Sequence, residues 1–227
     1  MTNNWLSEWS DSKVEIALKL NKGDCGGSYA EAAIILCSVL SGISADIWPG
    51  KHIDKKRFVE LLVKYSSDAL QVTRISTPLL INALETKSMT KESNNLFNAI
   101  MPKSEHLVIN GEDVDKYENE ILEICPEIDK TIIKQNSYAN ILYEEIRSGY
   151  THEYMPGARS DSWAMGTNRK NSLISYVNRV DMPHRLIHFN INWLCELVKS
   201  VVSNLEKENE IPVYTKYSQW WLLTHEI

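Results

Sequence analysis

Arg147 and His152 are the two residues of this chain whose types and spacing carry the clearest chemical content. They lie five residues apart near the end of a strongly helical segment, in the sequence Tyr-Glu-Glu-Ile-Arg-Ser-Gly-Tyr-Thr-His-Glu. Arginine is a permanently charged, forked donor that suits phosphate oxygens. Histidine is the side chain that most readily gains or loses a proton near neutral pH. Together the two side chains could hold a phosphodiester and move a proton on it.

The spacing of this pair has a geometric consequence. On a regular α-helix, five residues correspond to a rotation of about 140° and a rise of about 7.5 Å, so the two side chains do not share one tight face. An isologous dimer presents the same patch twice, and a two-fold axis here would collect two arginines and two histidines. The spacing therefore favours a composite site shared by two subunits. The alternative is structural: Arg147 pairs with Glu144 of its own helix, and His152 ends the helix.

Composition indicates a soluble globular protein. Of the 227 residues, 43% are hydrophobic and 24% are charged, which excludes the disordered class and is enough for a large core. The strongly apolar run from Ala32 to Leu40 is interrupted by Ser38 and is too short to span a bilayer. No basic region followed by an apolar one opens the chain, so we expect no signal peptide, no membrane contact and a cytoplasmic location. The four cysteines form no CxxC pair and are expected to be reduced and mostly buried.

Charge is unevenly distributed along the chain. The net charge of −6 argues against nucleic-acid binding by the whole surface. Residues 105–145 contain eleven acidic residues and three lysines, whereas residues 151–190 contain five basic and three acidic residues. If a polyanion binds, the later segment is the expected surface.

Most of the chain has helical patterning, with helices expected over 29–47, from Asp54 to about 65, from Thr77-Pro78, over 91–100, over 136–154 and over 191–207. Residues 114–124 and 126–134 are acidic amphipathic segments that could form one kinked helix. Residues 173–177 and 186–190 are strand-like and are predicted to pair as a hairpin. The sequence therefore predicts a mainly α, up-and-down helical bundle in one domain of residues 1–227. A small β-hairpin lies in an extended insertion at about 156–190, before the last long helix, and an aromatic tail ends the chain.

The Arg147-x4-His152 pattern at the end of a long helix resembles the motif of the HEPN superfamily (higher eukaryotes and prokaryotes nucleotide-binding domains). That family's mark is an arginine and a histidine separated by four to six residues. The Ala-rich run from Ala32 to Cys37 and the terminal helix after a short extended insertion are similar to uncharacterised bacterial members. The resemblance covers residues 28–207 and implies a helical bundle of HEPN type.

What the resemblance implies is a homodimeric endoribonuclease that uses no metal and no cofactor, serving defence or stress response. Arg147 and His152 would be catalytic, and the product would carry a 2′,3′-cyclic phosphate. Ser148 could orient the phosphate, while Tyr150 or Tyr154 could stack on a base. Expected partners are RNA or a nucleotide phosphate, a second copy of the chain, and an antitoxin or other protein. The alternative is a non-catalytic HEPN-like dimer module that binds nucleotide, RNA or protein.

Other patterns carry less chemistry. His184 and His188 are four residues apart but lack an evident third ligand, so a structural role is favoured over a metal site. The turn at 23–27 is not a phosphate-binding loop, because no GxGxxG pattern or preceding strand is present. An RNA-contacting edge and a solvated insertion are both open for Trp163, Arg169, Lys170 and Arg179. In the tail, Tyr217, Trp220 and Trp221 are expected to dock on the body of the protein.

Overall fold

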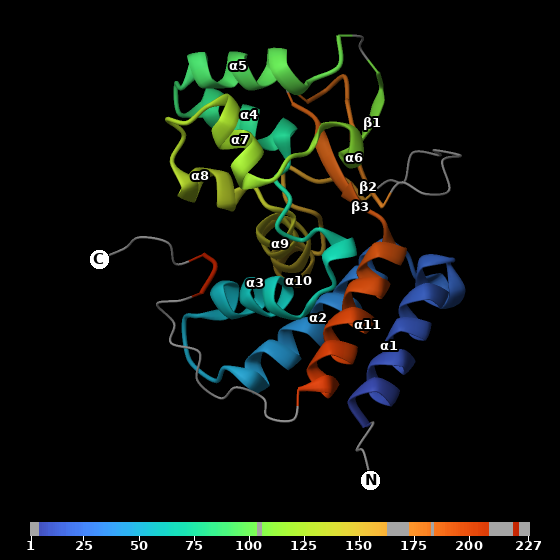
Figure 1. The fold of residues 1–227 in the computed structure, drawn as a ribbon. Coiled ribbons are helices and arrows are strands. Elements are labelled where there is room, and N and C mark those ends of the chain that lie inside the picture. Colours follow the sequence, from blue (N-terminus) through green and yellow to red (C-terminus); the bar gives the residue numbers. More distant parts are fainter. Residues whose placement is uncertain (1–4, 104–105, 163–172, 183, 209–219, 223–227) are drawn as a thin grey trace.

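The computed structural model describes residues 5–103, 106–162, 173–182, 184–208 and 220–222. Within these ranges the protein is mainly helical and carries one three-stranded antiparallel sheet (Figure 1). Figure 1 shows long helices in the lower part of the molecule and shorter helices with the sheet in the upper part. The predicted mainly α class is therefore confirmed at this level.

The lower part is a group of four helices, in which three helices pack around a central one. They are α1 (Trp5–Asn21), α2 (Tyr29–Ile47), α3 (Asp54–Tyr65) and α11 (Ile191–Lys207). The central α2 packs on the other three, and Leu36 and Leu40 on it are fully buried. By length and composition α2 could cross a membrane, but half of its apolar stretch is buried, as in the core helix of a globular protein.

The bounds of α2 and α11 agree with the predicted ranges, and two details differ elsewhere. Asp54, a residue type typical of an N-cap and expected to be one here, is instead the first helical residue of α3, and Ile53 is the N-cap. The helix α1 was not predicted. Its buried residues Val14 and Ala17 face the core, but Trp5, Trp9 and Ile16 are exposed, and this second apolar stripe obscures the amphipathic pattern.

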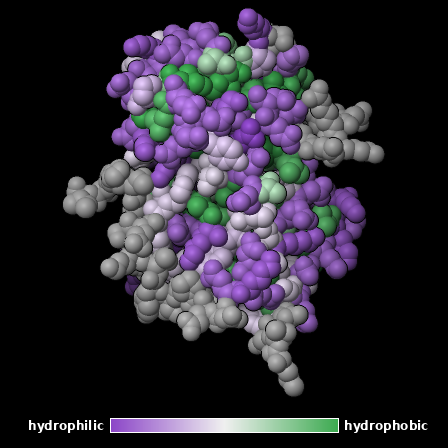
Figure 2. Space-filling model, in the orientation of Figure 1, coloured by the Kyte–Doolittle hydropathy of each residue, from purple (hydrophilic) through white to green (hydrophobic). Residues whose placement is uncertain are grey.

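The upper helices have an apolar cluster of their own. They are α4 (Thr77–Thr86), α5 (Thr90–Ile100), α6 (Gly111–Val114), α7 (Glu118–Ile124) and α8 (Lys130–Gln135). Leu80, Leu84 and Leu96 are among the residues buried in this second cluster. The acidic segments at 114–134 form separate short helices, so a single kinked helix is wrong. Figure 2 shows a mainly hydrophilic face, with hydrophobic residues grouped chiefly in this upper part.

The sheet consists of β1 (Val108–Asn110), β2 (Ile174–Val177) and β3 (Leu186–Phe189), in the order β1-β2-β3. The predicted hairpin is confirmed, since β2 and β3 pair antiparallel with Tyr176 opposite Ile187. The third strand, β1, was not predicted because three residues are too few to show an alternating pattern. The loop between the hairpin and residue 162 lies outside the described residues.

The remaining elements complete the chain. Two short 3₁₀ helices, η1 (Asp24–Gly26) and η2 (Asp68–Leu70), lie in connections. Trp220 of the tail is buried, and its ring meets the Trp48 ring edge-on at 5.4 Å between centroids. The backbone N–H of Trp221 donates to Glu60 Oε2 at 2.8 Å. Docking of the tail is thus confirmed for residues 220–222, while Tyr217 lies outside the described residues.

Candidate functional site

Tyr154 aside, the predicted site residues all lie on one helical stretch. It consists of α9 (Tyr138–Ile141), a π-helix labelled η3 (Leu142–Ser148), and α10 (Gly149–Glu153). The Ser137 hydroxyl caps its start by accepting the Asn140 N–H at 3.3 Å. A π-helix uses i→i+5 hydrogen bonds, is rare overall and occurs frequently at functional sites. The rotation assumed for a regular helix therefore does not hold for the segment that contains Arg147.

Arg147 is half-buried and packs against α2. Its Nε donates to Ser41 Oγ at 3.4 Å, and its guanidinium carbon lies 5.1 Å from the centroid of the Tyr143 ring. The guanidinium is also close enough to Cys37 to act on it electrostatically. Burial raises the pKa of the Cys37 thiol to about 12, and the Arg147 charge offsets only part of that rise. Cys37 is therefore a neutral core residue and not a nucleophile at neutral pH.

The ion pair between Arg147 and Glu144 that served as the structural alternative is not formed. Glu144 instead pairs through one oxygen with Lys55 and through the other with Arg159, at 2.8 Å for the latter. Glu145 also pairs with Arg159, at 2.7 Å. In the described part of the chain, Arg147 forms no ion pair. The Arg147 guanidinium contacts a hydroxyl and an aromatic ring instead of a carboxylate, so its charge is available to an external anion.

The other predicted site residues occupy different environments. His152 is exposed on α10, and Ser148 is half-buried at the end of the π-helix. Tyr150 is only 3% exposed and packs against Tyr29, with 6.1 Å between ring centroids. That burial makes Tyr150 a core residue whose ring is closed to a base. Tyr154 is 58% exposed and follows α10 directly, so its ring, unlike that of Tyr150, is accessible.

After α10 the chain turns back along the helix that carries the motif. We call residues 154–160 the return segment. Tyr154 opens it with a left-handed φ of 55°, and the Gly157 N–H donates to the Glu145 carbonyl at 2.8 Å. The approach is close at Gly149, where a Cβ would lie 2.6 Å from the Met155 carbonyl oxygen and 2.8 Å from the Gly157 nitrogen. Gly149 therefore permits the return, where the sequence suggested only a weakened helix.

Replacing Gly149 with alanine is expected to destabilise the protein. A helical Gly→Ala change usually stabilises by about 0.5–1 kcal/mol. Gly42 of α2 provides the matched control, because nothing lies within 4 Å of a Cβ added there. Chemical denaturation should show Gly42→Ala as neutral or stabilising and Gly149→Ala as destabilising. Equal stabilisation by both changes would contradict the close approach of the return segment.

The described arginines of the basic segment at 151–190 are engaged in contacts within the protein. Arg159 is committed to Glu144 and Glu145, and Arg179 pairs with Asp181 at 2.7 Å and with Asp161 at 3.6 Å. Arg185 donates to the His106 carbonyl at 2.7 Å. Arg159 and Arg179 are therefore ion-paired within the protein, and Arg185 is hydrogen-bonded to a backbone carbonyl. Trp163, Arg169 and Lys170 lie outside the described residues.

The histidine pair and the remaining cysteines have structural environments. His188 is buried in β3, and its Nδ1 lies 3.0 Å from the Asp161 carbonyl oxygen. Burial lowers the pKa of His188, which favours the neutral ring. Among the described residues, no group of three or more His, Cys, Asp or Glu side chains is placed to hold a metal ion. Cys125 and Cys195 are buried and Cys25 is exposed, all as free thiols.

A buried carboxylate, which the sequence did not single out, fixes the start of the motif helix. Asp115 is fully buried and accepts hydrogen bonds from the Tyr138 and Tyr176 hydroxyls and from the Thr77 N–H, the last two at 2.6 and 2.9 Å. Burial raises its pKa to about 7, against the opposing effect of these donors. Asp115 thus joins α4, α9 and β2. No motif could have revealed it, because its three partners are distant in sequence.

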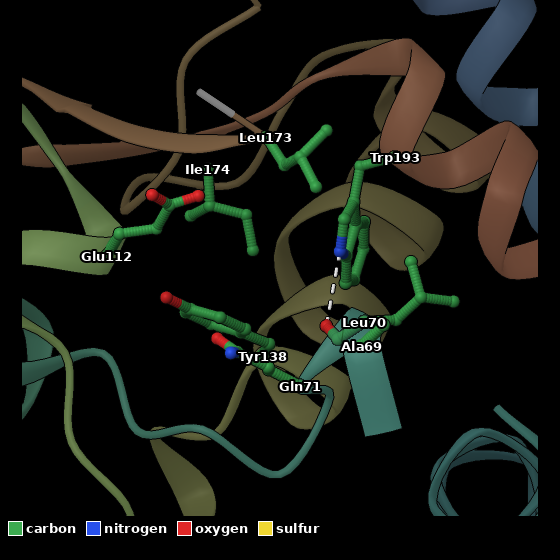
Figure 3. Close-up of a pocket in the computed structure, with 8 residues that line it drawn as sticks. All are labelled: Ala69, Leu70, Gln71, Glu112, Tyr138, Leu173, Ile174 and Trp193. Atoms are coloured by element: carbon green, nitrogen blue, oxygen red, sulfur yellow. Dashed lines mark hydrogen bonds between the residues drawn. The ribbon is translucent and has the colours of Figure 1, made fainter. Parts of the chain in front are cut away.

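A small pocket lies beside the same helix but away from the motif pair (Figure 3). Tyr138, Glu112 and Trp193 are among the residues that line it, and the Trp193 indole N–H donates to the Leu70 carbonyl at 3.2 Å. Its volume is about 90 Å³. Ligand pockets usually have about 300–1,000 Å³, so this pocket is too small for a nucleotide. Neither Arg147 nor His152 lines it.

The arrangement around the motif can therefore offer an anion a half-buried guanidinium and an exposed imidazole on one helical stretch, with an exposed tyrosine directly after it. Sequence reasoning singled out Arg147, His152 and Tyr154. It missed Arg159 and Asp115, whose positions depend on tertiary contacts. Comparison with protein-family models, with curated proteins and with solved structures gave no match.

Proposed function

We propose that this protein is a homodimeric endoribonuclease of HEPN type, in which Arg147 and His152 of two subunits act on one phosphodiester. The observation that carries the proposal is the environment of Arg147. Its guanidinium is half-buried and held toward Ser41 and Tyr143, while the adjacent carboxylates of Glu144 and Glu145 pair with other cations. A desolvated cation without a carboxylate is well suited to an anionic ligand such as phosphate.

The proposed chemistry uses the ribose of the substrate as its nucleophile. His152 of one subunit accepts the proton of the 2′-OH as the 2′ oxygen bonds to the adjacent phosphorus. Arg147 stabilises the negative charge that develops on the phosphoryl oxygens. The bond from phosphorus to the 5′ oxygen breaks, and the partner's His152 donates a proton to that oxygen. The products are a 2′,3′-cyclic phosphate and a 5′-OH, and DNA cannot react because it lacks the attacking hydroxyl.

The neighbouring residues support substrate binding in this proposal. Ser148 follows Arg147 at the end of the π-helix and would orient the phosphate. Tyr154 is exposed two residues after His152 and would stack on a base next to the cleaved bond, a contact worth about 1–3 kcal/mol per base. The exposed Met155 beside it, with 64% of its surface open, adds apolar surface for the base or for the second subunit.

The test compares RNA with DNA of the same sequence in buffer containing EDTA. The wild-type protein should cleave RNA and leave DNA intact, and sedimentation should show a dimer. Arg147→Ala should remove cleavage. Arg57→Ala is the control, because Arg57 is an arginine with little exposed surface that lies on α3 and pairs with Asp54. Cleavage that survives Arg147→Ala would contradict the proposed site, and RNA binding without cleavage would favour the non-catalytic module.

A further inference from the structure

Arg159 connects the return segment to the helix that carries the motif. Its Nε and backbone N–H both donate to the Glu145 carboxylate, at 2.7 and 3.0 Å, and one terminal nitrogen donates to Glu144 at 2.8 Å. The other terminal nitrogen lies 3.4 Å from Asn136 Oδ1. The guanidinium therefore spans two successive carboxylates of the π-helix and reaches the residue before the N-cap of α9.

The burial of these groups makes the contact stronger than a surface ion pair. The Glu145 side chain is 9% exposed and that of Arg159 is 24% exposed. Gly157 brings the backbone close, since a Cβ at this position would lie 2.2 Å from Glu145 Oε2. Exposed ion pairs contribute little, whereas removing one partner of a buried pair leaves an uncompensated charge. Arg159 therefore fixes the return segment at one position on the π-helix.

The same segment is also fixed to the sheet. The Arg159 carbonyl accepts the Ile187 N–H at 2.9 Å, and the Asp161 N–H donates to the Ile187 carbonyl at 2.9 Å. Strand β3 thus holds the backbone on either side of Ser160, while the Arg159 side chain holds the π-helix. In the sequence, α10 lies between the π-helix and the return segment; it has five residues and ends at Glu153.

We infer that Arg159 is a positioning residue that sets the orientation of His152 and Tyr154 relative to Arg147. The inference rests on the proposed function. His152 is exposed on a short helix whose end would fray without support, and its orientation therefore depends on the chain that follows. Arg147 is held separately, by α2. Losing the Arg159 contacts should thus displace the histidine and leave the arginine in place.

The chemistry of the arginine side chain makes the role specific. A planar fork can donate to Glu144 and Glu145 at the same time, whereas the single ammonium group of lysine cannot reproduce that geometry. Lysine should therefore preserve much of the charge balance and little of the positioning. The double change Arg159→Met with Glu145→Gln removes both charges, which avoids a buried unpaired carboxylate and protects the fold.

The experiment measures kcat and KM for RNA cleavage at a temperature where each variant is folded. We expect Arg159→Lys and the double variant to lower kcat about tenfold or more, because small displacements of catalytic groups are costly. KM should change less, since Arg147 still binds the phosphate. Arg57→Ala, which removes an ion pair on α3 whose arginine is also largely buried, should leave kcat near the wild-type value. Unchanged kcat in the Arg159 variants, or an equal loss in Arg57→Ala, would overturn the inference.

Amide hydrogen exchange of residues 149–158 separates this inference from the proposed function. Exchange in that peptide should be faster in both Arg159 variants than in wild type, whatever the activity. Unchanged exchange would overturn the positioning role even if the protein cleaves RNA. If the wild-type protein cleaves no RNA while exchange accelerates, the proposed function fails and the connection made by Arg159 stands as a structural one only, which contradicts the inference.

Discussion

Replacing His152 with alanine is expected to lower RNA cleavage by about 10²- to 10⁴-fold, the usual contribution of a general acid–base group. The loss should be larger than for any other exposed residue. In the proposed site, His152 of one subunit acts as the base and His152 of the other subunit acts as the acid, so the substitution removes both groups. Thermal stability should hardly change, since His152 is exposed and ends a short helix. Steady-state cleavage assays and a melting curve of the same preparation check both expectations.

A second histidine provides the control for that experiment. His52 is exposed in the loop before α3 and has a left-handed φ of 63°, a conformation that asparagine tolerates. His52→Asn should therefore retain wild-type cleavage. If His52→Asn and His152→Ala lose activity to the same extent, the assignment of His152 would be contradicted.

Replacing Asp115 with alanine is expected to have the largest effect on stability. The substitution would leave the hydroxyls of Tyr138 and Tyr176 and the N–H of Thr77 without their acceptor in the interior. Each unsatisfied buried group costs about 1–3 kcal/mol, so a total loss of at least about 3 kcal/mol is expected. Urea denaturation should show this as a lower midpoint. A loss below about 1 kcal/mol would contradict the three-way contact.

The stability of the protein should also depend on pH through Asp115. Burial raises the pKa of this carboxyl to about 7 in the folded protein, whereas an unfolded aspartate titrates near about 3.9. Between these values the unfolded chain has lost the proton that the folded chain retains, so this contribution to stability is full at low pH and is lost as pH rises through about 7. Asp115→Asn lacks the titration. Its stability relative to wild type should therefore increase between pH 5 and pH 8.

Long helices with one apolar side could be predicted from the sequence. The bounds of α2 and α11 follow from local signals, such as the Ser28–Glu31 capping box and the cap at Asn190. The strand β1 could not be predicted, because its three residues are defined by pairing with β2 and not by their own pattern. The π-helix was also invisible, since it depends on how the 142–148 stretch is held by its neighbours.

The site shows the same division between local and tertiary information. Arg147, His152 and Tyr154 could be proposed from the sequence because their types and spacing lie within one segment. Tyr150 was misjudged because burial against Tyr29 brings together residues 121 positions apart. Arg159 was interpreted as part of a basic surface, but its partners Glu144 and Glu145 lie on a helix that the chain meets again only by turning back. Charge in the sequence does not reveal which cations pair internally.

The most direct test of the central claim is the chemical nature of the 3′ end left on RNA in the presence of EDTA. Attack by the 2′-OH under Arg147 and His152 predicts a 2′,3′-cyclic phosphate in the wild-type reaction and none with His152→Ala. Mass spectrometry of a short defined oligonucleotide distinguishes this end from a 3′-OH. A 3′-OH product, or the same cyclic product from the His152→Ala protein, would contradict the account.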